Sequence, residues 1–280
     1  MLKDKTVAFL GAGSMAEAMI AGAIQARKLS SNQIIVTNNR NSLRLQELAS
    51  KYGVRTVPKE QLPYKDIDLF ILAMKPKGAS EALFSLKERL EPEQVVISIL
   101  AGITTGFMED HLQEGQQVIR VMPNTSSMVQ QSATAVTSGQ FMRAENVEVV
   151  KELLQAMGKV FVIEEEQMDL FTGIAGSGPA YFYYLMEHME QVGMQYGMPK
   201  ELIREIVSQT VYGAAKMVME KGTSPTILRE NVTSPNGTTA SGLKALADHK
   251  GGEAISQAIK KAAARSKQIS EELGRAKLNS

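Results

Sequence analysis

The stretch "TVAFLGAGSMAEAM", residues 6–19, contains the turn that decides the fold. A short apolar run at 6–10 ends at Gly11, and Met15 and Met19 follow at helical spacing. Within this context of strand, turn and helix, "GAGSMA" fits the pattern G-x-G-x-x-G/A. The first glycine permits the tight turn, and the second, Gly13, lets the backbone approach a pyrophosphate. The stretch predicts a Rossmann-type nucleotide site, with a glycine turn that binds no nucleotide as the alternative.

Short apolar runs recur along the first half of the chain, separated by segments long enough for crossover helices. They lie at 33–37, 68–73, 95–100 and 117–122. This alternation favours a doubly wound parallel sheet. Two further runs, 134–139 and 159–165, bracket an amphipathic segment at 144–157. We therefore predict an N-terminal α/β domain of Rossmann type over residues 1–165.

The second half of the chain changes to helical periodicity. Apolar residues spaced three or four positions apart run through 203–218 and 255–273. The sequence "GSGP" (176–179) interrupts a third helical pattern at 168–196, because proline lacks an N–H donor and glycine weakens a helix. We predict a C-terminal all-helical domain over 166–280 with a break at GSGP. Its apolar faces exceed what one copy can bury, so we expect a homodimer or a larger assembly of dimers.

Composition excludes several classes of function. The 280 residues include 31 Lys plus Arg against 30 Asp plus Glu, and this scattered, balanced charge argues against a nucleic-acid partner. The absence of cysteine excludes disulfides and thiol catalysis, and the three histidines match no metal-ligand spacing, so we expect no metal site. The apolar run at the start is too short for a signal peptide, and no run approaches the roughly 20 residues of a membrane span. We expect a soluble, cytoplasmic protein without a membrane partner.

The residues after the second predicted strand bear on the choice of cofactor. In dinucleotide folds an acidic residue about 20 positions beyond the glycine turn binds the adenosine ribose of NAD. Here that place reads "TNNRNS" (37–42), with the uncharged Asn38 and Asn39 followed by Arg40. The missing acid, and a cation able to pair with a 2′-phosphate, favour NADPH over NADH. The alternative is that Arg40 is a solvated loop residue.

Five segments carry a resemblance to a known family. They are "GAGSMAEAM" (11–19), "AMKP" (73–76), "VMPNT" (121–125), "GSGPAY" (176–181) and "VTSPNGTT" (232–239). In this order, along nearly the whole chain, they resemble pyrroline-5-carboxylate reductase. The resemblance implies a Rossmann domain that binds NAD(P)H and a helical domain that forms the dimer and completes the active site. The implied reaction reduces the cyclic imine 1-pyrroline-5-carboxylate to L-proline, the last step of proline synthesis.

By position, the resemblance also implies a cofactor site and a substrate site. The implied cofactor-binding residues are Gly11, Gly13, Ser14, Met15, Asn39, Arg40, Ala73, Lys75, Pro76 and Asn124. The glycine turn and Arg40 would hold phosphates, whereas the last three would lie along the ribose and nicotinamide. The implied substrate-binding residues are Ser234, Gly237, Thr238 and Thr239. Two departures from the family pattern are Asn236, where glycine is usual, and "MPNTSS" in place of "MPNTPA".

The segment "SPNGTTASGL" (234–243) suits a substrate that carries a carboxylate and an imine. A helix start offers free N–H donors and a macrodipole that favours an anion. Thr239 is the candidate catalytic residue, through a hydrogen bond to the ring nitrogen. Spacing alone favours a plain helix cap, and the resemblance favours the substrate site. The alternative functions are a reductase of a related cyclic imine or short β-hydroxy acid, and a non-catalytic nucleotide-binding paralogue.

Overall fold

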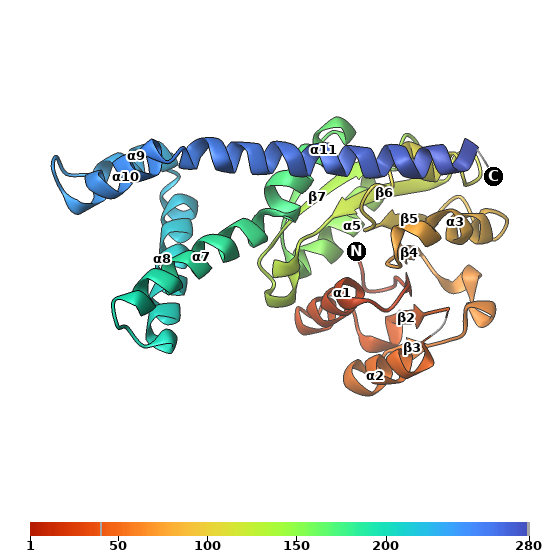
Figure 1. The fold of residues 1–280 in the computed structure, drawn as a ribbon. Coiled ribbons are helices and arrows are strands. Elements are labelled where there is room, and N and C mark those ends of the chain that lie inside the picture. The colour runs from red at the N-terminus through yellow and green to blue at the C-terminus, as the bar shows by residue number, and fades with distance from the viewer. Residues whose placement is uncertain (40, 279–280) are drawn as a thin grey trace. The chain divides into compact units, whose positions relative to one another are not determined.

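The computed structural model describes residues 1–39 and 41–278 (Figure 1). The chain divides into two compact units. The first comprises Met1–Ser177 together with the chain from Lys261 onward, and the second is Gly178–Lys260. The chain therefore leaves the first unit once and returns to it along its last helix. The first unit continues to Ser177, whereas the predicted domain boundary lies at residue 165. That boundary stays a prediction.

An eight-stranded sheet forms the centre of the first unit, in the order β3-β2-β1-β4-β5-β6-β7-β8. Its strands are β1 (Val7–Leu10), β2 (Ile34–Thr37), β3 (Arg55–Thr56), β4 (Leu69–Leu72), β5 (Val95–Ser98), β6 (Gln117–Met122), β7 (Ser132–Ser138) and β8 (Gly158–Val162). Neighbouring strands are parallel except β6 and β7, which are antiparallel. The order of the first six strands is that of a Rossmann sheet. The predicted doubly wound fold is confirmed, with one antiparallel pair that had not been predicted.

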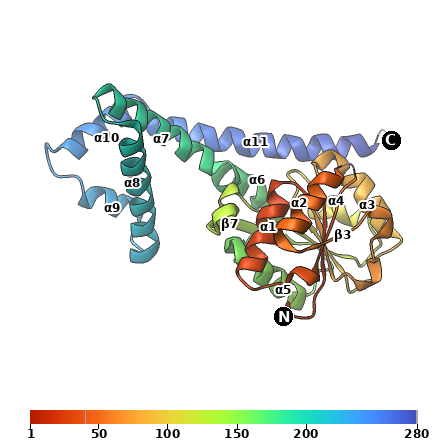
Figure 2. The same ribbon diagram turned by 90° about the horizontal axis from the view of Figure 1, so that it is seen from below.

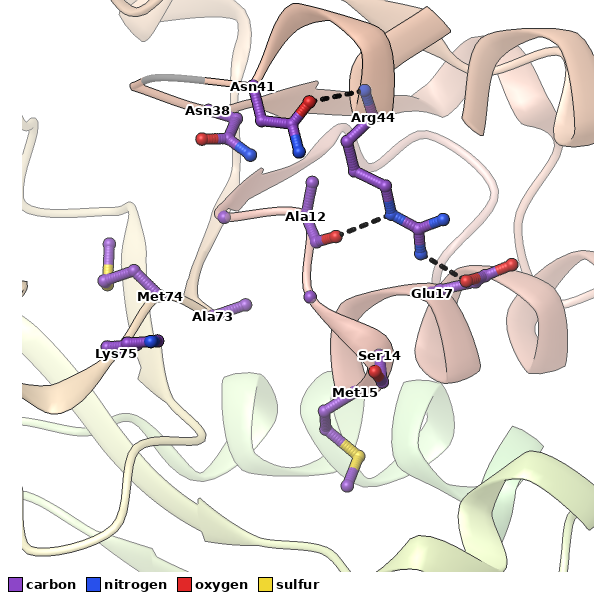
Figure 3. A pocket seen from close by; sticks show the side chains of 12 residues that line it. Ala12, Ser14, Met15, Glu17, Asn38, Asn41, Arg44, Ala73, Met74 and Lys75 are labelled. Atoms are coloured by element: carbon purple, nitrogen blue, oxygen red, sulfur yellow. Dashed lines mark hydrogen bonds and ion pairs between the residues drawn. The ribbon is translucent and has the colours of Figure 1, made fainter. Parts of the chain in front are cut away.

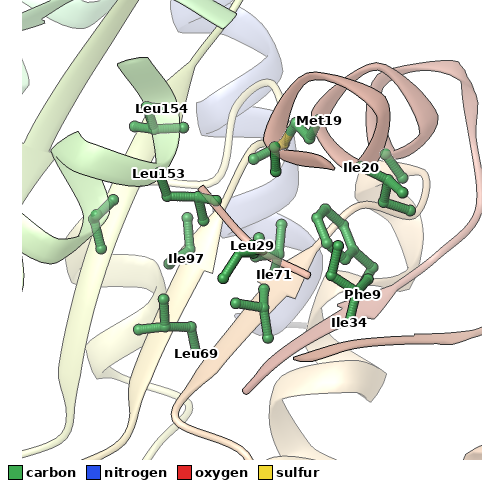
Figure 4. Close-up of a cluster of buried hydrophobic side chains, with 14 of the residues drawn as sticks. Phe9, Met19, Ile20, Leu29, Ile34, Leu69, Ile71, Ile97, Leu153 and Leu154 are labelled. Atoms are coloured by element: carbon green, nitrogen blue, oxygen red, sulfur yellow. The ribbon is translucent and has the colours of Figure 1, made fainter. Parts of the chain in front are cut away.

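Helices cover both faces of this sheet (Figure 2). They are α1 (Ser14–Gln25), α2 (Ser42–Tyr52), α3 (Ala79–Lys87), α4 (Thr105–Glu109) and α5 (Ala144–Leu154). Because side chains alternate along a strand, Val7 and Phe9 join one buried cluster, which includes residues of α1, α2 and α5 (Figure 4). Ala8 and Leu10 join the other, with α3 and α4. Each large side chain buried in this way contributes about 1.5–3 kcal/mol to folding.

The first strand lies at the point where the direction of winding reverses. β1 pairs with β2 on one side and with β4 on the other, and Leu10 is in register with both Thr37 and Leu72. The carboxyl ends of these three strands therefore lie at one edge of the sheet. In open α/β sheets, ligands bind in the crevice at such a switch point.

The second unit is helical, as predicted. It contains α7 (Gly178–Gln195), α8 (Lys200–Lys221), α9 (Pro225–Asn231), α10 (Thr238–Asp248) and the first part of α11 (Gly251–Leu278). Helices α7 and α8 approach closely at Gly193, where an added Cβ would lie 2.5 Å from Cγ1 of Ile203. Arg204 also donates to both carboxylate oxygens of Glu190, at 2.9 and 3.1 Å. These contacts hold the two helices together as a pair.

The predicted break at GSGP is confirmed. A short helix, α6 (Met168–Phe171), continues into a π-helical turn over Thr172–Gly176, and α7 then begins at Gly178. Pro179 lies in the first turn of α7, where an N–H group would have no acceptor within the helix. The missing N–H of proline therefore costs no hydrogen bond there.

The last part of α11 belongs to the first unit and contacts it near Asp169 and at Gly102. Ser266 donates to the carboxylate of Asp169 at 2.6 Å, and Asp169 lies 4.0 Å from the guanidinium of the buried Arg120. Gly102, at φ 80°, lies against the helix so closely that an added Cβ would be 2.7 Å from Cγ2 of Ile269. These contacts explain why the end of the helical region groups with the sheet.

Candidate functional site

A cleft of about 810 Å³ lies at the carboxyl ends of β1, β2 and β4 (Figure 3). Its volume is in the range that commonly holds a small-molecule ligand. Several residues predicted to bind a cofactor line it: Gly11, Gly13, Ser14, Met15, Ala73 and Lys75. The fold thus brings together residues from two distant segments of the chain, and their role in binding stays a prediction.

The packing of the protein itself requires glycine at position 11. The N–H of Gly11 donates to the carbonyl of Thr37 at 2.9 Å, and its φ of 125° lies in the region that favours glycine. A Cβ at this position would lie 2.5 Å from both the carbonyl carbon and the oxygen of Ala73. The turn after β1 therefore passes directly against the backbone after β4, and only glycine allows this approach.

Gly13 is different, because the protein leaves room beside it. It precedes α1 with an ordinary φ of −75°, and the nearest atom to an added Cβ is the carbonyl oxygen of Ala73, 3.9 Å away. Within the described part of the chain, no side chain caps the start of α1. The first N–H groups of a 12-residue helix are therefore left for a ligand, and they favour an anion. A side chain at Gly13 would fill space that the fold does not use.

Arg44, from the first turn of α2, reaches the glycine turn. Its Nε donates to the carbonyl oxygen of Ala12 at 3.0 Å, and its Nη2 pairs with the carboxylate of Glu17 on α1 (Figure 3). Hydrogen bonds from Arg44, and then from Lys51 at 2.9 Å, lower the pKa of Glu17 from 4.5 to about 2. Glu17 is therefore ionised at neutral pH, and it lines the same cleft as the glycine turn.

A second, smaller cavity of about 390 Å³ adjoins the segment after β2. The predicted cofactor residue Asn39 lines it, together with Asn38 and Asn41. The side chain of Asn41 accepts a hydrogen bond from the N–H of Arg44 at 2.9 Å and so caps α2. Arg40, predicted to pair with a 2′-phosphate, lies outside the described residues.

The remaining predicted cofactor residues follow β4 and β6. Lys75 lines the cleft, and Pro76 begins the short 3₁₀ turn after it. Asn124 is buried, and its side chain is used by the protein: it donates to the carbonyl of Ala175 and accepts from the N–H of Ser126, each at 3.0 Å. These bonds connect the end of β6 with the π-helical turn that precedes α7.

The predicted substrate residues lie next to one another in the second unit. The N–H of Gly237 donates to the carbonyl of Ser234 at 3.1 Å, closing a turn through Pro235 and Asn236. Asn236 has a φ of 60°, the conformation that the third residue of a type II turn requires and that asparagine tolerates. A Cβ at Gly237 would lie 2.6 Å from Oγ of Ser234 and 3.1 Å from its carbonyl oxygen, so a larger residue would require the Ser234 side chain to shift. The departure from the family pattern at Asn236 leaves the turn intact.

This turn ends in a helix start without a side-chain cap. Gly237 is the N-cap of α10 and has no side chain that could satisfy the first N–H groups of the helix. No other side chain in the described part of the chain caps α10. Thr238 and Thr239 occupy the first two positions of the helix and are exposed. The reading of this segment as a plain cap thus has no capping hydrogen bond to support it. The free amides and hydroxyls suit an anion.

Some cleft residues were not predicted from the sequence, namely Ala12, Glu17, Asn38, Asn41, Arg44 and Met74. A capping asparagine before an amphipathic helix was the available signal for Asn41 and the start of α2. Arg44 is separated in the sequence from Ala12 by 32 residues and from Glu17 by 27. No local sequence pattern indicates contacts between residues so far apart.

Comparison with known proteins agrees with these observations. Residues 165–269 match the family described as pyrroline-5-carboxylate reductase dimerisation, and residues 6–102 match the family described as NADP oxidoreductase coenzyme F420-dependent. Pyrroline-5-carboxylate reductase 1 of Bacillus subtilis is 56% identical over 270 residues, which cover 96% of this chain and 91% of the relative. This chain belongs to the pyrroline-5-carboxylate reductase family.

More distant relatives and solved structures of pyrroline-5-carboxylate reductases extend the likeness. The Arabidopsis thaliana protein is 34% identical, with 95% of each chain covered. The structure from Coxiella burnetii superposes with a TM-score of 0.87 at 32% identity, covering 96% of this chain and 99% of the other. A Plasmodium falciparum structure with NADP bound has a TM-score of 0.87 at 25% identity, covering 96% and 100%. The likeness to reductases of this family thus covers both units.

Two negative findings concern the described residues only. None of their helices is long and apolar enough to cross a membrane. Their His, Asp and Glu side chains form no group of three or more that could hold a metal ion.

The contrast between the two glycines predicts different effects of the same substitution. Gly11→Ala should lower the free energy of unfolding by more than about 2 kcal/mol, because the Cβ meets backbone at a positive φ. Gly13→Ala should change it by less than about 1 kcal/mol but should raise the Kd for NADPH at least about tenfold by filling the cleft. Thermal denaturation and a fluorescence titration of each variant measure both quantities. Weakened folding in Gly13→Ala with unchanged cofactor binding would contradict this assignment.

Proposed function

We propose that this member of the pyrroline-5-carboxylate reductase family reduces 1-pyrroline-5-carboxylate to L-proline with NADPH. The observation that carries the proposal is the unfilled space beside Gly13 at the switch point of the sheet. A fold that needs glycine at Gly11 for its own packing has no such need at Gly13. The absent side chain is explained by a ligand that approaches the backbone there.

The residues of the cleft fit a pyridine dinucleotide. The uncapped start of α1, with Gly13, Ser14 and Met15, would hold the pyrophosphate through its N–H groups. Lys75 and Pro76 after β4, and Asn124 after β6, would lie along the ribose and nicotinamide. When bound, NADPH supplies the hydride that the imine carbon accepts.

The segment 234–239 would hold the substrate. Its carboxylate suits the free N–H groups at the start of α10, which are supported by the helix macrodipole. The Ser234–Gly237 turn brings backbone and the hydroxyls of Thr238 and Thr239 to the same place. Thr239 is the proposed catalytic residue, hydrogen bonding the ring nitrogen and so orienting the imine carbon. Orientation of this kind accounts for several kcal/mol of a barrier.

The matched pair of threonines at the second position of two helices tests the role of Thr239. Thr239→Val removes the hydroxyl at nearly constant volume, and turnover number should fall more than substrate affinity. Thr226→Val makes the same change in the first turn of α9, where Thr226 is also exposed, and should leave turnover unchanged. Steady-state kinetics and melting temperature are measured for both. If Thr239→Val lost about 1 kcal/mol of stability and kept its turnover, the hydroxyl would be a cap and not part of the site.

We further propose that NADPH is preferred over NADH, because Asn38 and Asn39 stand where an acid would bind the ribose and Arg40 follows them. Arg40→Ala should raise the KM for NADPH by about 10- to 150-fold, the value of one charge-assisted hydrogen bond, and leave the KM for NADH almost unchanged. Initial rates with both cofactors measure this. Equal changes for the two cofactors would show that Arg40 does not read the 2′-phosphate.

The assembly proposed is a homodimer, or a larger assembly of dimers, built through the helical unit. Residues 165–269 match a dimerisation domain, and the second unit exposes large apolar side chains. They include Phe182, Tyr183, Tyr184, Leu185, Met189, Val192, Tyr212, Met217 and Met219. An exposed apolar surface of this kind marks an interaction site. Light scattering that returned the mass of a single active chain would contradict the proposal.

The alternative substrates are tested by the same assay of NADPH oxidation. Turnover with 1-pyrroline-5-carboxylate, and little with other cyclic imines or keto acids, is the expected result. A reductase of a short β-hydroxy acid is disfavoured because it would use a lysine early in the helical domain, and no lysine occurs between Lys159 and Lys200.

A further inference from the structure

We infer that Arg44 is a positioning residue for the cofactor: it fixes the orientation of the Ala12–Gly13 peptide and thereby sets the pyrophosphate-binding amides. This inference rests on the proposed placement of the cofactor over the glycine turn. Arg44 was not among the residues that the sequence singled out, and it acts from α2 through backbone and not by contact with the nicotinamide.

The first observation concerns the partners of the Arg44 guanidinium nitrogens. Nε donates to the carbonyl oxygen of Ala12 at 3.0 Å, Nη1 donates to Glu47 at 3.1 Å, and Nη2 pairs with Glu17. The side chain is only 25% exposed. Each nitrogen therefore contacts a different element: the glycine turn, α2 itself and α1. A planar guanidinium held at three places is a rigid support.

The second observation is the peptide that Arg44 holds. No peptide bond between described residues is cis, so the Gly13 N–H points opposite to the Ala12 carbonyl oxygen. Fixing that oxygen on Arg44 therefore fixes the direction of the Gly13 N–H. Glycine at Gly13 has no side chain to restrict the backbone, so the turn depends on outside contacts for its order. Arg44 provides such a contact within the cleft.

The third observation is the carboxylate next to the turn. Glu17 lines the cleft, is 22% exposed and would repel a bound pyrophosphate. It is held by Arg44, by Lys51 at 2.9 Å and by the hydroxyl of Tyr52 at 2.9 Å. Lys51 and Tyr52 remain if Arg44 is removed, so the carboxylate keeps two partners. Among the described residues, by contrast, only Arg44 donates a side-chain hydrogen bond to the carbonyl oxygen of Ala12. Orienting this part of the backbone is therefore the main role of the side chain.

The pattern of cofactor affinities separates this role from phosphate reading. Arg44→Met removes the donors and keeps much of the packing volume, and the Kd for NADPH and for NADH should both rise by the same factor, at least about tenfold. Turnover number at saturating cofactor should stay within about twofold of the unmodified protein, because the chemistry is untouched. Arg44→Lys keeps the positive charge but not the planar guanidinium, and it should also weaken the binding of both cofactors. It provides a second variant if Arg44→Met is unstable.

The matched control is Glu47→Gln, which removes the charge of a different partner of Arg44, at a residue that does not line the cleft. It should leave both Kd values unchanged. The double variant Arg44→Met with Glu17→Gln separates geometry from charge, and its Kd should stay within about threefold of that of Arg44→Met. Cofactor titrations by fluorescence and melting temperatures without cofactor provide readouts independent of activity.

Four results would overturn the inference. Weakened binding of NADPH alone would mean that Arg44 reads the 2′-phosphate. Full recovery in the double variant would mean that Arg44 only neutralises Glu17. Unchanged binding in Arg44→Met, with weakened binding in Gly13→Ala, would remove Arg44 from the site while the placement of the cofactor stands. If neither variant weakened binding, the proposed placement itself would fail and the inference with it.

Discussion

The close approach of Gly11 to the backbone of Ala73 is the constraint on which the rest of the first unit depends. Parallel strands β1 and β4 are neighbours, and the turn after one must pass the turn after the other without a side chain between them. This approach places the start of α1 over the carboxyl ends of the strands. The cleft, the open position at Gly13 and the bond from Arg44 to Ala12 all lie at this turn.

The helical unit solves a similar problem with different residues. The turn through Pro235 and Asn236 needs a positive φ at its third residue. It leads into a helix start that no described side chain caps. In both units, therefore, a glycine stands at the N-cap of a helix, where serine, threonine, aspartate or asparagine would satisfy the first amides. Leaving these donors free costs stability, and anions offset that cost when they bind.

The elements with strong local patterns could be predicted from the sequence. The apolar runs of β1, β2, β4, β5 and β6 and the break at GSGP agree with the structure to within a few residues. The strand β3 has two residues, Arg55 and Thr56, neither apolar, so no run announces it. The antiparallel pairing of β6 with β7 was missed, although the nine residues 123–131 between them are too few for a parallel crossover.

The candidate site was predictable only where a motif is contiguous. The glycine turn, "AMKP" and "SPNGTT" each carry their own signal. The pairing of Glu17 with Arg44 gives no such signal, because it depends on how α1 and α2 pack. The return of α11 to the first unit could not be predicted from the sequence either, because the apolar stripe of this helix continues unchanged across residue 260.

The most direct test is a crystal structure of the protein with NADP⁺ and L-proline bound. The expected result has the pyrophosphate oxygens about 2.7–3.2 Å from backbone nitrogens at Gly13–Met15, with Arg44 still donating to the carbonyl of Ala12. The proline carboxylate is expected at the start of α10, on the amides and hydroxyls of Thr238 and Thr239. A pyrophosphate bound away from the glycine turn, or a carboxylate bound away from α10, would contradict the proposed site.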